Sequence, residues 1–104
     1  MTTLLVLTNL PDRAAAERIA DLLVEQRLAA CANLLAPCRS VYRWKGAVQR
    51  EEEHPVLIKT TVERYAALEQ ALRAAHPYEV PEIIALPIEQ GLQAYLDWVA
   101  AQTR

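Results

Sequence analysis

The feature that most constrains this chain is the order in which short apolar segments and amphipathic segments alternate along its 104 residues. Residues 3–8 are a continuous run of aliphatic and threonine side chains, which is typical of a central strand buried on both faces. Pro11 and Asp12 suit the first turn of a helix, and the apolar residues after them are spaced for one amphipathic helix that ends near residue 28. The chain therefore begins with a predicted strand and a helix that covers it.

The middle of the chain has the residue content of strands. Residues 31–44 favour an extended segment that is broken or bent at Pro37. The Lys-Gly pair at 45–46 predicts a hairpin turn, and residues 48–60 are then the returning strand. Its three consecutive glutamates, residues 51–53, are expected to form a solvated strand end.

The remainder predicts a helix, a strand and a second, shorter helix. Thr60 and Glu63 have the spacing of a capping box, which begins a helix that Pro77 ends. Residues 80–86 are apolar enough for a buried fourth strand, and residues 92–99 have the spacing of a short terminal helix.

This order, βαββαβ followed by a helix, predicts the α+β class with a ferredoxin-like split βαβ sandwich. A chain of 104 residues supports one such domain, residues 1–104, and is too short for two. The strands are apolar on both sides, whereas one terminal helix is too short to cover the sheet face left by the first two helices. The hairpin over residues 40–60 is also longer than a small sheet needs, so we predict a homo-oligomer.

Charge and hydropathy restrict the classes of binding partner that this sequence favours. Eleven basic and thirteen acidic residues give a formal net charge of −2, without the basic excess typical of nucleic-acid binding. No apolar run approaches the roughly 18 residues of a membrane span, and the first residues lack a basic signal region. We expect a soluble cytoplasmic protein without nucleic acid or membrane as partner.

Several kinds of chemistry are excluded or left open by the sequence. The two glycines are isolated, so no phosphate-binding or dinucleotide-binding loop is present, and Ser40 lies in a strand rather than at a nucleophile elbow. With no catalytic constellation, we expect a protein that is not an enzyme. Cys31 and Cys38 form no CxxC motif; apolar neighbours predict a packed thiol at Cys31, and Arg39 accompanies an exposed thiol at Cys38.

The densest group of chemically versatile residues is the segment 76–82, His-Pro-Tyr-Glu-Val-Pro-Glu. A neutral imidazole and a carboxylate, as in His76 and Glu82, can ligate Cu²⁺ or Zn²⁺. The alternative is structural: His76 caps carbonyls at the helix end, and the prolines stiffen the turn into the next strand. The residues themselves leave both interpretations open.

Together with Ala85-Leu86-Pro87-Ile88 and Gly91, the segment 76–83 resembles the signature of the CutA family of divalent-cation tolerance proteins. The resemblance covers the whole chain in order. The other matching segments are Arg27-Leu28-Ala29-Ala30-Cys31-Ala32-Asn33, Ser40-Val41-Tyr42, Trp44 with Gly46, Glu53, Ile58-Lys59-Thr60-Thr61 and Tyr95-Leu96-Asp97-Trp98.

The resemblance implies a ferredoxin-like protomer in a homotrimer whose long hairpins pair edge to edge between subunits. It also implies a role in tolerance of divalent cations, copper especially, with copper binding in some members. The similarity of this trimer to PII signalling proteins gives an alternative function, a module that binds a small anionic ligand or a partner protein.

The copper site proposed in some family members is incomplete in this sequence. A first-strand cysteine and a His-His pair are replaced here by Thr8 and by Ala75-His76. The resemblance therefore implies only a weak site for Cu²⁺ or another divalent cation, with His76 and Glu82 as ligands.

We also expect a polar cleft near the subunit boundaries. Lys59 is expected to hold an anion there or to pair with Glu53, and the aromatic residues of the hairpin are expected mainly to bury area between subunits. The cleft candidates are His76, Tyr78, Glu82, Lys59, Tyr42 and Trp44.

Overall fold

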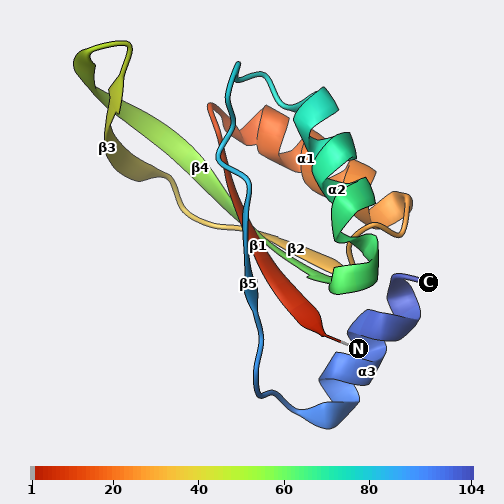
Figure 1. The fold of residues 1–104 in the computed structure, drawn as a ribbon. Coiled ribbons are helices and arrows are strands. Elements are labelled where there is room, and N and C mark those ends of the chain that lie inside the picture. The colour runs from red at the N-terminus through yellow and green to blue at the C-terminus, as the bar shows by residue number, and fades with distance from the viewer. Residues whose placement is uncertain (1) are drawn as a thin grey trace.

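The protein is described by a computed structural model that covers residues 2–104, and its fold is an antiparallel sheet with three helices. Figure 1 shows α1 and α2 side by side on one face of the sheet, and α3 at the end of the sheet near the N-terminus. The elements are β1 (Thr3–Leu10), α1 (Arg13–Glu25), β2 (Cys31–Leu34), β3 (Cys38–Trp44), β4 (Ala47–Thr61), α2 (Val62–Ala75), β5 (Ile84–Pro87) and α3 (Gln93–Gln102).

The strand order confirms the predicted fold class. The sheet order is β2-β4-β1-β5, and β3 pairs with a different stretch of β4. The helix α1 connects β1 to β2, and β4 lies between these two strands, which is the split βαβ arrangement. All strand neighbours are antiparallel.

β4 is 15 residues long, and its first half extends beyond the sheet as a hairpin arm with β3 (Figure 1). β4 changes its partner from β2 to β3 between Val56 and Glu53. Residues 35–37 lie there opposite residues 54–55, so three residues face two and form a bulge that contains Pro37 and Pro55. The predicted turn is confirmed: Lys45 and Gly46 have φ of 49° and 81°, the two positive values of a type I′ hairpin.

The core lies between the sheet and the helix pair α1 and α2. Alternate residues of β1 and β4 point into it, as the two-residue period of a strand requires. Burying each large aliphatic side chain stabilises the fold by about 1.5–3 kcal/mol. The large aliphatic side chains that are fully buried there are Val6, Leu10, Ile19, Leu23, Val56, Ile58, Leu68 and Leu72.

The starts of α1 and α2 differ from the predicted ones. Asp12 precedes α1 as its N-cap, and its carboxylate accepts a hydrogen bond of 2.8 Å from the Ala15 amide. The capping box predicted at Thr60 is wrong, because Thr60 pairs with Leu4 inside β4 and its hydroxyl donates instead to the Leu28 carbonyl at 2.6 Å. α2 begins after Thr61, without a side-chain cap.

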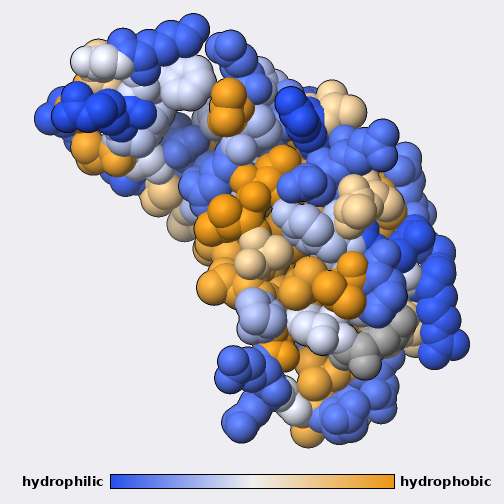
Figure 2. All heavy atoms as spheres, in the orientation of Figure 1, coloured by the Kyte–Doolittle hydropathy of each residue, from blue (hydrophilic) through white to orange (hydrophobic). Residues whose placement is uncertain are grey.

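The second face of the sheet is apolar and largely uncovered. Cross-strand register places Leu5, Leu7 and Leu57 on this face together with Ile84 and Leu86 of β5. Ile84 and Leu86 are 50% and 49% exposed, so the prediction of a buried last strand is wrong for the single chain. Figure 2 shows apolar side chains gathered along the middle of the molecule, where β5 and β1 run.

The last strand is also shorter than predicted and the terminal helix covers little. β5 starts at Ile84, after the irregular segment that contains Pro81. α3 packs against β1 and β4, but only Val99 of this helix is buried. None of the helices formed by residues 2–104 combines the length and the apolarity needed to cross a membrane.

Candidate functional site

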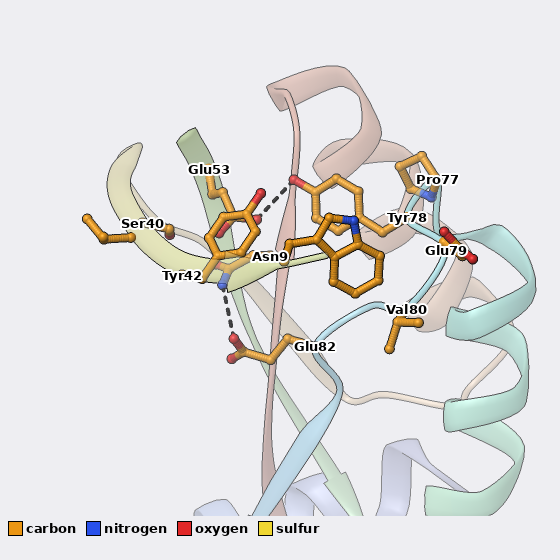
Figure 3. Close-up of a pocket in the computed structure, with 11 residues that line it drawn as sticks. Asn9, Ser40, Tyr42, Glu53, Pro77, Tyr78, Glu79, Val80 and Glu82 are labelled. Atoms are coloured by element: carbon orange, nitrogen blue, oxygen red, sulfur yellow. Dashed lines mark hydrogen bonds between the residues drawn. The ribbon is translucent and has the colours of Figure 1, made fainter. Parts of the chain in front are cut away.

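A pocket of about 640 Å³ lies between the hairpin arm and the segment that follows α2 (Figure 3). This volume is in the range of about 300–1,000 Å³ that small-molecule sites occupy. It is lined by Asn9 of β1, by Ser40, Val41, Tyr42 and Trp44 of β3, by Glu53 of β4, and by Pro77, Tyr78, Glu79, Val80 and Glu82.

The central contact of the pocket joins Tyr78 to Glu53. The Tyr78 hydroxyl donates a hydrogen bond of 2.9 Å to a carboxylate oxygen of Glu53 (Figure 3). Glu53 is 7% exposed, so the prediction that the whole acidic run is solvated is wrong at this position, because the segment after α2 folds over it. Burial and the Glu53 carboxylate raise the pKa of Tyr78 well above its ordinary value, which keeps the phenol protonated as a donor.

His76 is buried behind the pocket and holds its wall in place. Its Nε2 lies 2.8 Å from the Asn9 carbonyl oxygen and 3.2 Å from the Thr8 hydroxyl, and its Nδ1 accepts a hydrogen bond of 3.2 Å from the Tyr78 amide. Because Nδ1 accepts, the ring proton is on Nε2 and donates to Asn9. Burial lowers the pKa of His76, partly opposed by the Asn9 carbonyl and the Glu53 charge, so the neutral ring is favoured.

The predicted metal ligands do not converge on one point. Glu82 is exposed and accepts a weak hydrogen bond of 3.4 Å from the Asn9 amide, whereas both ring nitrogens of His76 are engaged within the fold. Within residues 2–104 no group of three or more His, Cys, Asp or Glu side chains is arranged to hold a metal ion. The pocket therefore does not fit a resident copper ion, because the thiolate position is Thr8 and the metal-ligating side chains that line the pocket offer only oxygen atoms.

The aromatic side of the pocket is contributed by the hairpin arm. Tyr42 and Trp44 are 41% and 37% exposed and line the cavity. Partial burial and the nearby acidic side chains of the arm raise the pKa of Tyr42. At the rim, the ammonium of Lys45 lies 5.6 Å from the Trp44 ring centroid and 3.5 Å from a Glu79 carboxylate oxygen.

Lys59 and the cysteines lie away from the pocket. Lys59 pairs with Cys31 across β2 and β4, donates to the Asn33 side chain, and has its Nζ 4.0 Å from the Cys31 sulfur. Lys59 therefore does not pair with Glu53, because the five residues 54–58 of β4 lie between them along the strand. Cys31 is half-buried rather than packed in the core, and Cys38 is exposed, as expected.

Four of the six predicted cleft residues lie around one cavity, namely Tyr42, Trp44, Tyr78 and Glu82. Four further polar residues line the cavity and were not among the predicted cleft residues: Asn9, Ser40, Glu53 and Glu79. Glu53 follows two solvated glutamates without any change of pattern, and only the pairing of the arm with the distant segment 77–82 reveals its burial. Glu79 was part of the cluster that the sequence singled out.

These features define an α+β protein with ferredoxin-like topology and an acidic, aromatic recess beside a projecting hairpin. The chain belongs to the CutA1 divalent ion tolerance protein family, whose model matches residues 4–102. A divalent-cation tolerance protein CutA of Thermus thermophilus is 46% identical over 98 residues, which cover 94% of this chain and 95% of that protein.

Solved structures agree in fold over nearly the whole chain. The CutA1 of Oryza sativa has a TM-score of 0.96 at 38% identity and covers 100% of this chain and 95% of its own. A protein described as the periplasmic divalent cation tolerance protein CutA of Archaeoglobus fulgidus has a TM-score of 0.94 at 35% identity and covers 98% of this chain and 99% of its own.

Proposed function

We propose that this protein acts in divalent-cation tolerance, copper above all, as a non-enzymatic homotrimer whose pocket is a ligand-binding recess. The name that the Thermus thermophilus relative bears supports the tolerance role. The observation that carries the assembly is the exposed apolar sheet face, on which Ile84 and Leu86 are about half exposed. Monomeric proteins rarely leave such a contiguous apolar surface in water.

The hairpin arm supports the same assembly. Residues 47–53 of β4 pair with β3 on one side only, because the pairing of β4 with β1 begins at His54. Their other edge is therefore available for a strand of another copy, and unpaired edges are surfaces that proteins cover or pair. The exposed apolar residues of the arm, Val41 and Val48, add to the area that such pairing would bury.

We further propose that direct metal binding by this chain is weak and occurs through the exposed carboxylate Glu82 rather than through His76. Both ring nitrogens of His76 already have partners, whereas among residues 2–104 Glu82 has only the 3.4 Å contact with the side-chain amide of Asn9. A single carboxylate with water gives a site of low affinity and low selectivity among divalent cations.

A binding role fits the pocket better than a catalytic one. Its one buried carboxylate, Glu53, is engaged by Tyr78, whose raised pKa keeps it a hydrogen-bond donor. A second candidate function is a signalling module of the PII kind, and the observation that favours it is a cavity the size of a small organic ligand. None of the eleven residues lining this cavity is Lys or Arg, so its charge does not favour an anion.

We propose the cytoplasm as the compartment. The two cysteines are free thiols, as is usual in a reducing environment. Fractionation of the producing cell, with a cytosolic and a periplasmic marker, tests this assignment; recovery of the protein with the periplasmic marker would overturn it.

The tolerance role is tested by complementation. A bacterial strain that lacks its own CutA protein is supplied with this chain, with Leu86→Glu, or with an empty vector, and growth is followed over a copper series. We expect the native chain to extend the copper range and Leu86→Glu to lose that effect. Identical growth of native chain and empty vector would overturn the proposed function.

Calorimetry of two variants tests which residue binds the metal ion. We expect Cu²⁺ to bind weakly, Glu82→Gln to remove that binding and His76→Gln to leave it unchanged. Tight Cu²⁺ binding that His76→Gln abolishes would show instead that His76 is the ligand.

A further inference from the structure

The charged residues that line the pocket are all acidic. Three carboxylates, those of Glu53, Glu79 and Glu82, line it, while none of its eleven lining residues is Lys or Arg. Figure 3 shows Glu53 and Glu82 at separate points of the wall, each with one hydrogen-bond partner from the protein. A recess of this charge attracts cations and repels anions.

Glu53 is the buried carboxylate of these three, and it can accept further hydrogen bonds. Glu53 is 7% exposed, and within residues 2–104 its only hydrogen-bond donor is the Tyr78 hydroxyl. A carboxylate has acceptor sites on both oxygens, and burying it is costly unless charged or polar donors occupy them. Within residues 2–104 the only buried side-chain oxygen without a hydrogen-bond partner is that of Thr61, so the second oxygen of Glu53 is open to the pocket, where a donor that carries positive charge can reach it.

The rim of the pocket already holds one organic cation, which belongs to the chain itself. The Lys45 ammonium lies 5.6 Å from the Trp44 ring centroid and 3.5 Å from Glu79. An aromatic face and a carboxylate are the two groups that recognise ammonium ions. Tyr42 and Glu53 provide the same two kinds of group in the same pocket, and within residues 2–104 no Lys or Arg pairs with Glu53.

We propose that the pocket binds a small organic cation with at least one primary ammonium group, which donates to Glu53 and packs against Tyr42 and Trp44. The inference deepens the proposed function by naming the ligand class of the same recess. A metal ion fits less well, since about 640 Å³ greatly exceeds one ion and residues 2–104 offer no group of three metal-ligating side chains. An ammonium needs acceptors and aromatic faces rather than a coordination sphere.

Calorimetry with a matched pair of probes tests the proposal. The native protein is titrated at low ionic strength with 1,4-diaminobutane and, separately, with 1,4-butanediol, which has the same length and no charge. We expect saturable binding of the diamine only. Equal heats from both probes, or none from the diamine, would overturn the proposal.

Point variants test whether the diamine binds in this pocket. Glu53→Gln keeps an acceptor for Tyr78 but removes the charge, and we expect it to weaken diamine binding about tenfold. Trp44→Leu should weaken it about threefold through the lost aromatic contact. The matched control is Glu52→Gln, the neighbouring residue, which lines a different hollow with Arg39 and Arg50 and should leave binding unchanged.

One variant should act in the opposite direction. Lys45→Asn keeps a residue that tolerates the positive φ of the turn and removes the competing ammonium, so diamine binding should tighten about twofold to threefold. If Glu52→Gln weakens binding as much as Glu53→Gln, the diamine responds to overall surface charge and the proposal fails. Complementation of copper tolerance without any diamine binding would overturn this inference alone, and diamine binding without complementation would overturn the tolerance role alone.

Discussion

The hydroxyl of Tyr78 and the carboxylate of Glu53 are joined by a hydrogen bond of 2.9 Å that links residues 25 positions apart in the sequence. This contact ties the segment after α2 to the base of the hairpin arm, and it closes the inner wall of the pocket (Figure 3). Because Glu53 is buried, the bond stabilises a charge that water does not reach freely.

Removing the donor of this bond should destabilise the protein. We expect Tyr78→Phe to lower the free energy of unfolding by about 1.5–3 kcal/mol, the range for a hydrogen bond to a buried charge. Denaturant unfolding at pH 7 measures it. The control is Tyr65→Phe, which removes a 3.2 Å bond to the exposed Glu69 and should cost less than about 0.5 kcal/mol. Equal losses in the two variants would contradict the account.

Replacement of two adjacent threonines by valine should affect stability differently. The Thr60 hydroxyl donates to the Leu28 carbonyl at 2.6 Å, so Thr60→Val should destabilise by about 1–2 kcal/mol. The buried Thr61 hydroxyl has no hydrogen-bond partner within residues 2–104, so Thr61→Val should be neutral or stabilising. Thermal and denaturant unfolding of both variants test the pair, and a loss at Thr61 equal to that at Thr60 would refute it.

His76 should make stability depend on pH. Its pKa in the folded state is lowered below the unfolded value of about 6.5, so the unfolded chain binds more protons near that pH. The stabilisation is complete above the unfolded pKa and is lost as the pH falls through about 6.5 toward the lowered folded value.

Unfolding measured from pH 8 to pH 5 checks this dependence. His76→Gln, which keeps a donor for the Asn9 carbonyl but does not titrate, should show a flatter profile over this range. His54→Gln leaves the contacts of His76 in place and should retain the loss. A native profile that stays flat, or one that His76→Gln does not flatten, would rule out His76 as the titrating group.

A charged residue introduced on the uncovered sheet face should have a large effect only if that face is an interface between chains. Leu86 is 49% exposed in the single chain, so Leu86→Glu would be almost neutral for a monomer but would place a charge inside an assembly. We expect this variant to fall apart into single chains or weakly associated ones. Val62→Glu, at a residue 53% exposed at the start of α2, is the matched control and should leave the assembly intact.

Most of the fold could be predicted from the sequence because its signals are local. The apolar run before residue 10, the helical spacing of α1 and α2, and the Lys45-Gly46 turn each act within a few residues, and each element is present. The helix starts were less accurate: a hydroxyl such as that of Thr60 can cap a helix or bond across the core, and only the strand pairing decides which.

The site was predictable only in part, for a related reason. The segment from His76 to Glu82 was identifiable by its residue types, but the environment of each side chain depends on what the hairpin arm places against it. Glu53 became a buried partner of Tyr78, and His76 used both ring nitrogens within the fold instead of facing a ligand. Lys59 lies outside the expected cleft because the strand register pairs it with Cys31.

The most direct test of the assembly on which this account depends is the molar mass of the native protein by light scattering, measured across a dilution series to low micromolar concentration. We expect a mass three times the 11.7 kDa of one chain, unchanged on dilution. A stably folded species at the mass of a single chain would contradict it.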